Sequence, residues 1–162
     1  MMDRTLLEKE LYSICRGLRN IFDQCVIAHP DLFKSFPKGF CNHVSIWTYD
    51  YLYSLGYKNI NFCASDNFLF SNKHYCHIWL NYQGIDIDLT CDQYNSTESK
   101  YDSVIVSATN VLYKDVLYRP SRQEQVELEY YNPMRDMIFP NAHRERDIIY
   151  NAMGLVFKLN IL

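Results

Sequence analysis

The most informative segment of the chain is residues 74–90, which read HYCHIWLNYQGIDIDLT. In its last part (IDIDLT) apolar and polar residues alternate, and this period of two is typical of a half-buried β-strand. Gln83 and Gly84 separate the two halves and favour a tight turn. The segment is therefore predicted to form an antiparallel hairpin with strands at 74–82 and 85–90.

The segments on either side of the hairpin show the spacing of helices and further strands. Helical spacing stops near His29-Pro30 and again at Gly56, and Ser121 and Glu124 have the spacing of a capping box. The predicted helices are 3–27, 41–55, 121–130 and 142–158; the other predicted strands are 59–64, 103–107 and 111–118; 65–72 is predicted to be a loop. This order predicts an α+β fold, in which the helix at 41–55 packs on an antiparallel sheet and N- and C-terminal helices flank it.

Composition and charge narrow the functional classes. The chain has 162 residues, 48% of them hydrophobic and 22% charged, which favours one globular domain spanning 1–162. The net charge of −3 offers no basic excess for a phosphate backbone, so nucleic acid is not an expected partner. A membrane span needs roughly 20 consecutive apolar residues, and none is found. Without a secretory signal, the expected location is cytoplasmic; a secreted effector without a cleavable signal is the alternative.

The cysteines are expected to be reduced and not to bind metal. The chain is long enough to build a core, and its six cysteines form no C-x-x-C pair. His74, Cys76 and His77 lie close together in sequence, but strand alternation would point Cys76 and His77 to opposite faces. No metal or cofactor is therefore predicted.

Three residues have the types and order needed for nucleophilic catalysis. Cys41 follows a glycine-containing turn and opens a predicted helix, whose free N–H groups favour a thiolate and can stabilise an oxyanion. Counting outward from a turn centred between Tyr82 and Gln83 places His77 directly opposite Asp88. A carboxylate that orients an imidazole, which activates a thiol, is the Cys-His-Asp arrangement.

Other residues compete for, or add to, these roles. His74 and His43 are rival bases, and Asp86 is a rival for orienting the imidazole, although the counted register places it across from Trp79. Trp79 shares a strand face with His77 and is predicted to shield the imidazole or contact substrate, with plain core packing as the equal alternative. Gln24 and Gln93 are candidate polar contacts for an oxyanion or substrate. In the structural alternative, Cys41 is a buried apolar residue and His77 a strand histidine bonded to a carbonyl.

The motifs resemble those of the transglutaminase-like superfamily within the papain-like cysteine enzymes. They are Gly39-Phe40-Cys41 at a helix start, His77-Ile78-Trp79-Leu80, and Ile87-Asp88-Leu89-Thr90. The resemblance covers about residues 36–94 and lacks the Gly-x-Cys-Trp type of signature. It implies a papain-like fold with Cys41 as nucleophile, His77 as base and Asp88 as the orienting residue.

The resemblance implies a cysteine hydrolase or acyltransferase that acts on amide bonds of a protein or peptide through a thioester. Protease, amidase, deamidase and transglutaminase activities all fit this chemistry. Two alternatives remain: an arylamine-acetyltransferase-like acyl carrier, which shares the triad, and a non-catalytic binding module that kept the scaffold.

Overall fold

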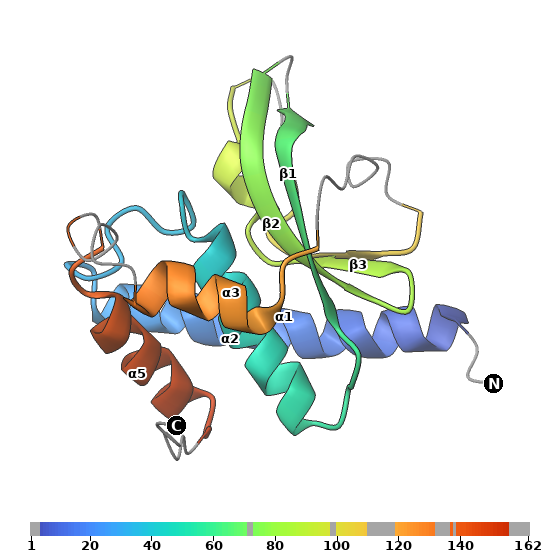
Figure 1. Ribbon diagram of the computed structural model, residues 1–162, viewed down its shortest axis with the longest axis horizontal. Helices are drawn as coiled ribbons and strands as arrows, with labels where there is room; N and C mark the ends of the chain where they lie inside the picture. Colours follow the sequence, from blue (N-terminus) through green and yellow to red (C-terminus); the bar gives the residue numbers. More distant parts are fainter. Residues whose placement is uncertain are drawn as a thin grey trace.

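A computed structural model describes residues 4–70, 73–97, 100–109, 119–131, 137 and 139–155. The side chains of residues 66–70, 73–75 and 131 are outside that description. A four-stranded antiparallel sheet lies against helices from both ends of the chain, so the predicted α+β class is confirmed (Figure 1).

The sheet has the strand order β1-β2-β3-β4. Its strands are β1 (Asn61–Phe70), β2 (Lys73–Tyr82), β3 (Ile85–Asp88) and β4 (Ile105–Ser107). β1 runs well beyond the predicted 59–64, because its backbone pairs with β2 as far as Phe70 opposite Lys73, past an irregularity between Ser65 and Phe68. The loop predicted at 65–72 is therefore wrong for residues 65–70. The strand predicted at 111–118 lies outside the described residues.

Alternation gives the sheet two different faces. Ile78, Leu80 and Ile87 belong to the main hydrophobic core, whereas Cys63 and Trp79 belong to a smaller cluster. Residues 77, 79, 86 and 88 share the parity of the second face. The polar side chains predicted for the site are thus separated from the main core by the sheet itself.

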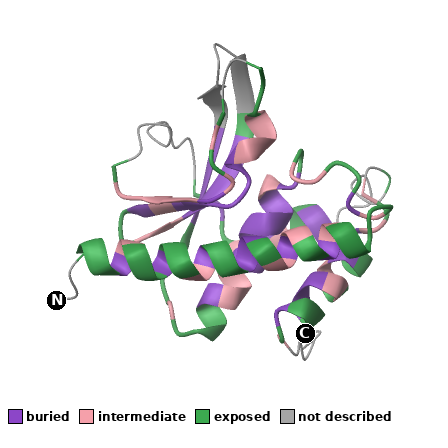
Figure 2. Ribbon diagram, turned by 180° about the vertical axis from the view of Figure 1, so that it is seen from behind, coloured by how far each residue is buried: buried purple, intermediate pink, exposed green. Residues whose placement is uncertain are grey.

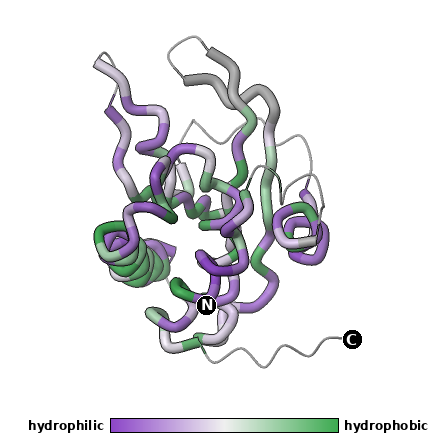
Figure 3. Tube along the Cα trace, turned by 90° about the vertical axis from the view of Figure 1, so that its left-hand side faces the viewer, coloured by the Kyte–Doolittle hydropathy of each residue, from purple (hydrophilic) through white to green (hydrophobic). Residues whose placement is uncertain are grey.

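The first helix, α1 (Arg4–Ala28), covers one side of the molecule. The sequence predicts an apolar stripe of Leu7, Leu11, Ile14, Leu18, Ile21 and Cys25 on this helix. Leu7, Leu11, Leu18 and Cys25 are buried as predicted, whereas Ile14 and Ile21 are half-buried and Phe22, which is not part of the predicted stripe, is fully buried. Figure 2 shows that the outward side of α1 is exposed. Figure 3, which looks along the axis of α1, places α1 and α3 (Arg122–Val126) on opposite sides of the fold.

The second helix, α2 (Cys41–Ser54), occupies the centre. The sequence predicts one buried face on this helix, formed by Val44, Thr48, Leu52 and Leu55. Residues 42–48 are instead all buried, so the first two turns are covered on every side, and Leu55 is 51% exposed. Gly56 ends the helix at a φ of 100°, and Tyr57 N–H bonds Leu52 O in a Schellman motif.

The C-terminal helices pack against α2. Ser121 and Glu124 form the predicted capping box, but α3 passes into a π-helical turn, η3 (Glu127–Tyr131), where one regular helix was predicted. α5 (Ala142–Ala152) ends earlier than predicted, because Gly154 at φ 69° closes it. Among the described residues, no helix has both the length and the apolar character needed to cross a membrane.

Candidate active site

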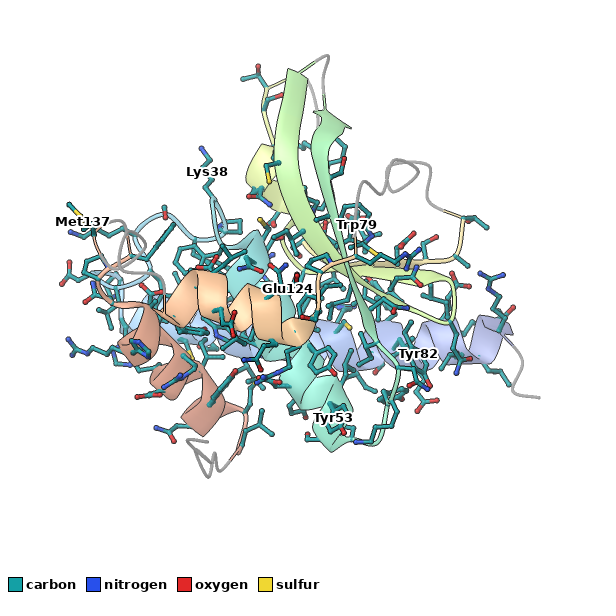
Figure 4. All side chains as sticks on the ribbon, viewed as in Figure 1. Lys38, Tyr53, Trp79, Tyr82, Glu124 and Met137 are labelled. Carbon is teal, nitrogen blue, oxygen red and sulfur yellow. The ribbon has the colours of Figure 1, made fainter. Side chains whose placement is uncertain are left out.

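Cys41 is the first residue of α2. The first main-chain hydrogen bond of the helix is donated by Val44 N to Phe40 O at 2.9 Å. The N–H groups of residues 41–43 therefore do not take part in the i to i−4 hydrogen bonds of the helix. Gly39, two residues earlier, has a φ of 79°, which a glycine adopts without strain. Cys41 is half-buried, as a nucleophile reachable from solvent would be. Lys38, which precedes Gly39 in the same loop, extends its side chain away from the molecule (Figure 4).

His77 and Asp88 form a buried hydrogen-bonded pair. His77 Nε2 lies 2.7 Å from Asp88 Oδ2, and the two residues are 0% and 2% exposed. The other carboxylate oxygen, Oδ1, accepts hydrogen bonds from Thr90 N at 2.8 Å and Thr90 Oγ1 at 3.0 Å. Both oxygens of the buried Asp88 carboxylate therefore accept hydrogen bonds, and these bonds fix the orientation of the carboxylate toward the imidazole.

The pair forms in a different strand register from the predicted one. β2 and β3 pair Leu80 with Ile87, Asn81 with Asp86 and Tyr82 with Ile85, so the turn is centred between Gln83 and Gly84. Continuing this register places His77 diagonal to Asp88, and the prediction that they lie directly opposite is wrong. Diagonal neighbours on one sheet face are still within reach of long side chains, so the contact forms.

The surroundings of His77 favour its charged form. Burial alone would lower the pKa of the imidazole, but the charge and hydrogen bond of Asp88 and the Cys41 side chain raise it to about 10. The Cys41 side chain is thus close enough to the imidazole to affect its pKa. Because Asp88 takes Nε2, Nδ1 is the ring nitrogen left for the thiol. The three predicted residues thus meet in one site.

A short 3-10 helix, η1 (Cys91–Tyr94), brings two further side chains to Nδ1. Gln93 Nε2 lies 3.3 Å and the Tyr94 hydroxyl 3.1 Å from His77 Nδ1. Gly39 N donates to Gln93 Oε1 at 3.2 Å, which links η1 to the loop before Cys41. Gln93 lies in the site, as predicted, and its contact with substrate remains a prediction. Tyr94 was not identified from sequence, because a tyrosine in a polar, aperiodic stretch carries no local signal of its position.

A buried arginine holds η1 in place. Arg19 of α1 bonds both carboxylate oxygens of Asp92 at 2.8 and 2.9 Å, and also Leu89 O at 2.8 Å and Ser103 O at 3.1 Å. Its helical spacing would place it on the solvent side of α1, yet it is buried. Hydrogen bonds to a charged group are roughly twice as strong as neutral ones, so this contact fixes the residues next to His77.

Trp79 and Asp86 lie near His77 on the same face of the sheet. Trp79 is fully buried, and its ring stacks on that of His77 at 5.9 Å and 18° (labelled in Figure 4). This placement suits the predicted shield around the imidazole, and contact with substrate stays a prediction. Asp86 accepts hydrogen bonds from Trp79 Nε1 at 3.1 Å and Asn81 Nδ2 at 2.7 Å, and it lies opposite Asn81. Asp88, and not Asp86, is the carboxylate on His77.

The remaining candidates lie elsewhere or outside the described side chains. His43 is buried with its Nε2 3.2 Å from Glu129 Oε2, and Gln24 is exposed on α1. The side chain of His74 is outside the description. Strand alternation leaves Cys76 exposed and His77 buried, as expected. Across the described part of the chain, no three His, Cys, Asp or Glu side chains are grouped so that they could hold a metal ion.

Comparison with known proteins does not identify a family for this chain. No family model, no curated protein and no solved structure matches the chain. Function is therefore inferred from the positions of Cys41, His77 and Asp88.

Proposed function

We propose that the chain is a cysteine enzyme of the papain-like, transglutaminase-like class, which breaks or exchanges amide bonds through a thioester. The observation that carries this proposal is the fully buried His77, hydrogen-bonded by Asp88 on one side and by the half-buried Cys41 on the other. A buried imidazole fixed between a carboxylate and a thiol at a helix N-terminus has the geometry of a base that activates a nucleophile.

In the first half of the reaction, the Cys41 proton passes to Nδ1 of His77, and the sulfur attacks the amide carbonyl carbon. The oxyanion that forms lies near the N–H groups at the start of α2, which stabilise it. Collapse of this intermediate breaks the C–N bond. The leaving nitrogen takes the proton from Nδ1, and the acyl group remains on sulfur as a thioester.

In the second half, a water molecule or an amine attacks the thioester and gives a proton to Nδ1. The C–S bond breaks, and the sulfur leaves as a thiolate beside the protonated imidazole. Water yields hydrolysis, and an amine yields acyl transfer. A protein or peptide is the proposed substrate, because the amide bonds and side-chain amides on which this class acts are found there.

The test combines thiol labelling with a chromogenic active ester. In iodoacetamide footprinting at neutral pH, Cys41 should be alkylated faster than the other five cysteines. The ester should give a burst of released alcohol and an acyl adduct on Cys41, detected by mass spectrometry, and alkylation should abolish the burst.

The exposed Cys76 supplies the matched control. Cys76→Ser should keep the burst and the labelling of Cys41, whereas Cys41→Ala should lose both. Fastest labelling at Cys76, or the absence of any acyl adduct on Cys41, would make the chain a non-catalytic binding module on this scaffold.

A further inference from the structure

Two side chains, Gln93 and Tyr94, lie within hydrogen-bond distance of Nδ1 of His77, and they offer it different partners. The Gln93 amide nitrogen is a donor, and the Tyr94 oxygen is a possible acceptor. We propose that Gln93 stabilises the neutral imidazole and Tyr94 the imidazolium, so that each protonation state of the base has its own partner. Both are then positioning residues for the acyl transfer proposed above, on which this inference rests.

The orientation of the Gln93 side-chain amide is set by a hydrogen bond to the main chain and not by the imidazole. Gly39 N–H donates to Oε1 at 3.2 Å, so the amide oxygen points toward the loop before Cys41. The NH₂ group is left facing His77 Nδ1 at 3.3 Å and Thr90 Oγ1 at 3.4 Å. An NH₂ group only donates, so it bonds Nδ1 only when that nitrogen has a free lone pair, which is the neutral state.

Tyr94 has the complementary arrangement. Its hydroxyl donates to Cys76 O at 3.3 Å, which leaves the oxygen lone pairs for His77 Nδ1 at 3.1 Å. A lone pair accepts from Nδ1 only when that nitrogen carries a proton. Burial, followed by the nearby Cys41 and Asp88, raises the pKa of the Tyr94 phenol, so the hydroxyl stays protonated at neutral pH.

Both partners are needed because Nδ1 gains and loses a proton in each half of the proposed reaction. The described titratable groups around the His77 ring are Asp88 on β3, Cys41 on α2 and Tyr94 on η1. The exposed Cys76, which precedes His77 on β2, is the fourth. Asp88 and Cys41 favour the imidazolium, whereas burial of the ring and the hydrogen bond from the Gln93 amide favour the neutral form. Gln93 thus keeps the base able to give its proton away.

The test is an NMR titration of the ¹⁵N-labelled His77 ring in the full chain. Gln93→Met removes the donor and should raise the imidazole pKa, whereas Tyr94→Phe removes the acceptor and should lower it. Each shift should be about 0.5–1 pH unit, the effect of one hydrogen bond. The NMR titration does not depend on turnover. If no thioester forms, the proposed function is overturned, whereas the roles of Gln93 and Tyr94 are still tested by the measured pKa of His77.

A second variant at Gln93 sharpens the test. Gln93→Glu keeps an acceptor for Gly39 N–H but turns a carboxylate oxygen toward Nδ1, so the pKa should rise further and the pH optimum of turnover should move to alkaline pH. Tyr82→Phe is the control, because the Tyr82 hydroxyl accepts a hydrogen bond from Gln83 and Tyr82 lies apart from Trp79 in Figure 4. Shifts of equal sign for Gln93→Met and Tyr94→Phe, or shifts no larger than that of Tyr82→Phe, would overturn the proposal.

Discussion

The molecule contains two buried histidine–carboxylate pairs that differ in what surrounds them. His77 and Asp88 lie 2.7 Å apart on the sheet, and His43 and Glu129 lie 3.2 Å apart between α2 and η3. All four side chains are at most 1% exposed. Distance and burial are therefore alike in the candidate catalytic pair and in the second pair.

Their neighbours do distinguish them. The His77 pair is bonded on one side by Thr90 and touches the half-buried Cys41 on the other. The His43 pair belongs to a group of buried polar side chains, here called the closed layer, that consists of Asn42, His43, Gln125, Glu129 and Glu145. Within it, the Asn42 side-chain amide donates to Glu129 at 2.6 Å. Among the described residues, this layer also holds buried polar atoms without a hydrogen-bond partner, namely Asn42 Oδ1, both amide atoms of Gln125 and Glu145 Oε2. Access to a nucleophile, and not the pair itself, makes one of them a candidate catalytic group.

The largest expected effect separates the two histidines. His77→Ala removes the proposed base and should lower turnover of the active ester by at least about a thousandfold, the scale of losing one member of a catalytic triad. His43→Gln, which keeps a donor toward Glu129, should leave turnover per folded molecule within about threefold. Burst kinetics and urea unfolding of both variants measure the difference. Equal losses of turnover at unchanged stability would place His43 in the chemistry and refute the comparison.

The two carboxylates should differ in the same way, with a smaller effect. Asp88→Asn favours the wrong tautomer of His77, and we expect a loss of about a hundredfold, because thiols depend less on the third residue than serine does. Glu129→Gln should change turnover by less than about threefold. Asp86→Asn is the control on the same strand. A loss for Asp86→Asn as large as that for Asp88→Asn contradicts the assignment of the orienting carboxylate.

The smallest effect concerns the stability of the closed layer. Burial, together with the negative charge of Glu129, raises the pKa of Glu145 from 4.5 to about 7. The folded state then holds this proton more tightly than the unfolded chain, so the contribution of Glu145 to the free energy of unfolding is greatest below pH 4.5 and is lost as the pH rises to 7. Glu145→Gln removes this fall and should stabilise the protein at about pH 8 by at most about 3 kcal/mol, from roughly 1.4 kcal/mol per pH unit.

Urea unfolding of wild type and Glu145→Gln at two pH values checks this prediction. The variant should gain stability at about pH 8 and little or none near pH 4.5. An equal difference in the free energy of unfolding at both pH values would show that the glutamine acts through packing and not through the proton.

Sequence patterns predict the parts of this molecule that depend on near neighbours. The stripe of α1, the start of α2 at Cys41 and the capping box at Ser121 follow from residues three or four positions apart. The hairpin brings His77 to Asp88 because the two are only 11 residues apart and share a face. The register was wrong because the turn centre lies one residue further along the chain than counted.

Distant contacts account for what sequence alone did not predict. Asn42 reaches Glu129 over 87 residues and Arg19 reaches Asp92 over 73, and no local pattern reports either. The π-helical turn that carries Glu129 and Tyr130 inward also has no spacing signal in a segment predicted as a regular helix. β1 extends through polar residues because pairing with β2 outweighs their low strand propensity.

The hydrogen bonds made by Arg19 bear on when, during synthesis, the proposed nucleophile Cys41 would become reactive. They join α1 to Leu89, Asp92 and Ser103 over 70, 73 and 84 residues, and closing such loops costs chain entropy that only a docked sheet offsets. A growing chain therefore exposes Cys41 long before η1 has a place beside His77. We expect the nascent thiol to be inert toward neighbouring proteins at the ribosome. Stalled chains that end at about residue 100 should react with iodoacetamide no faster than an ordinary cysteine does.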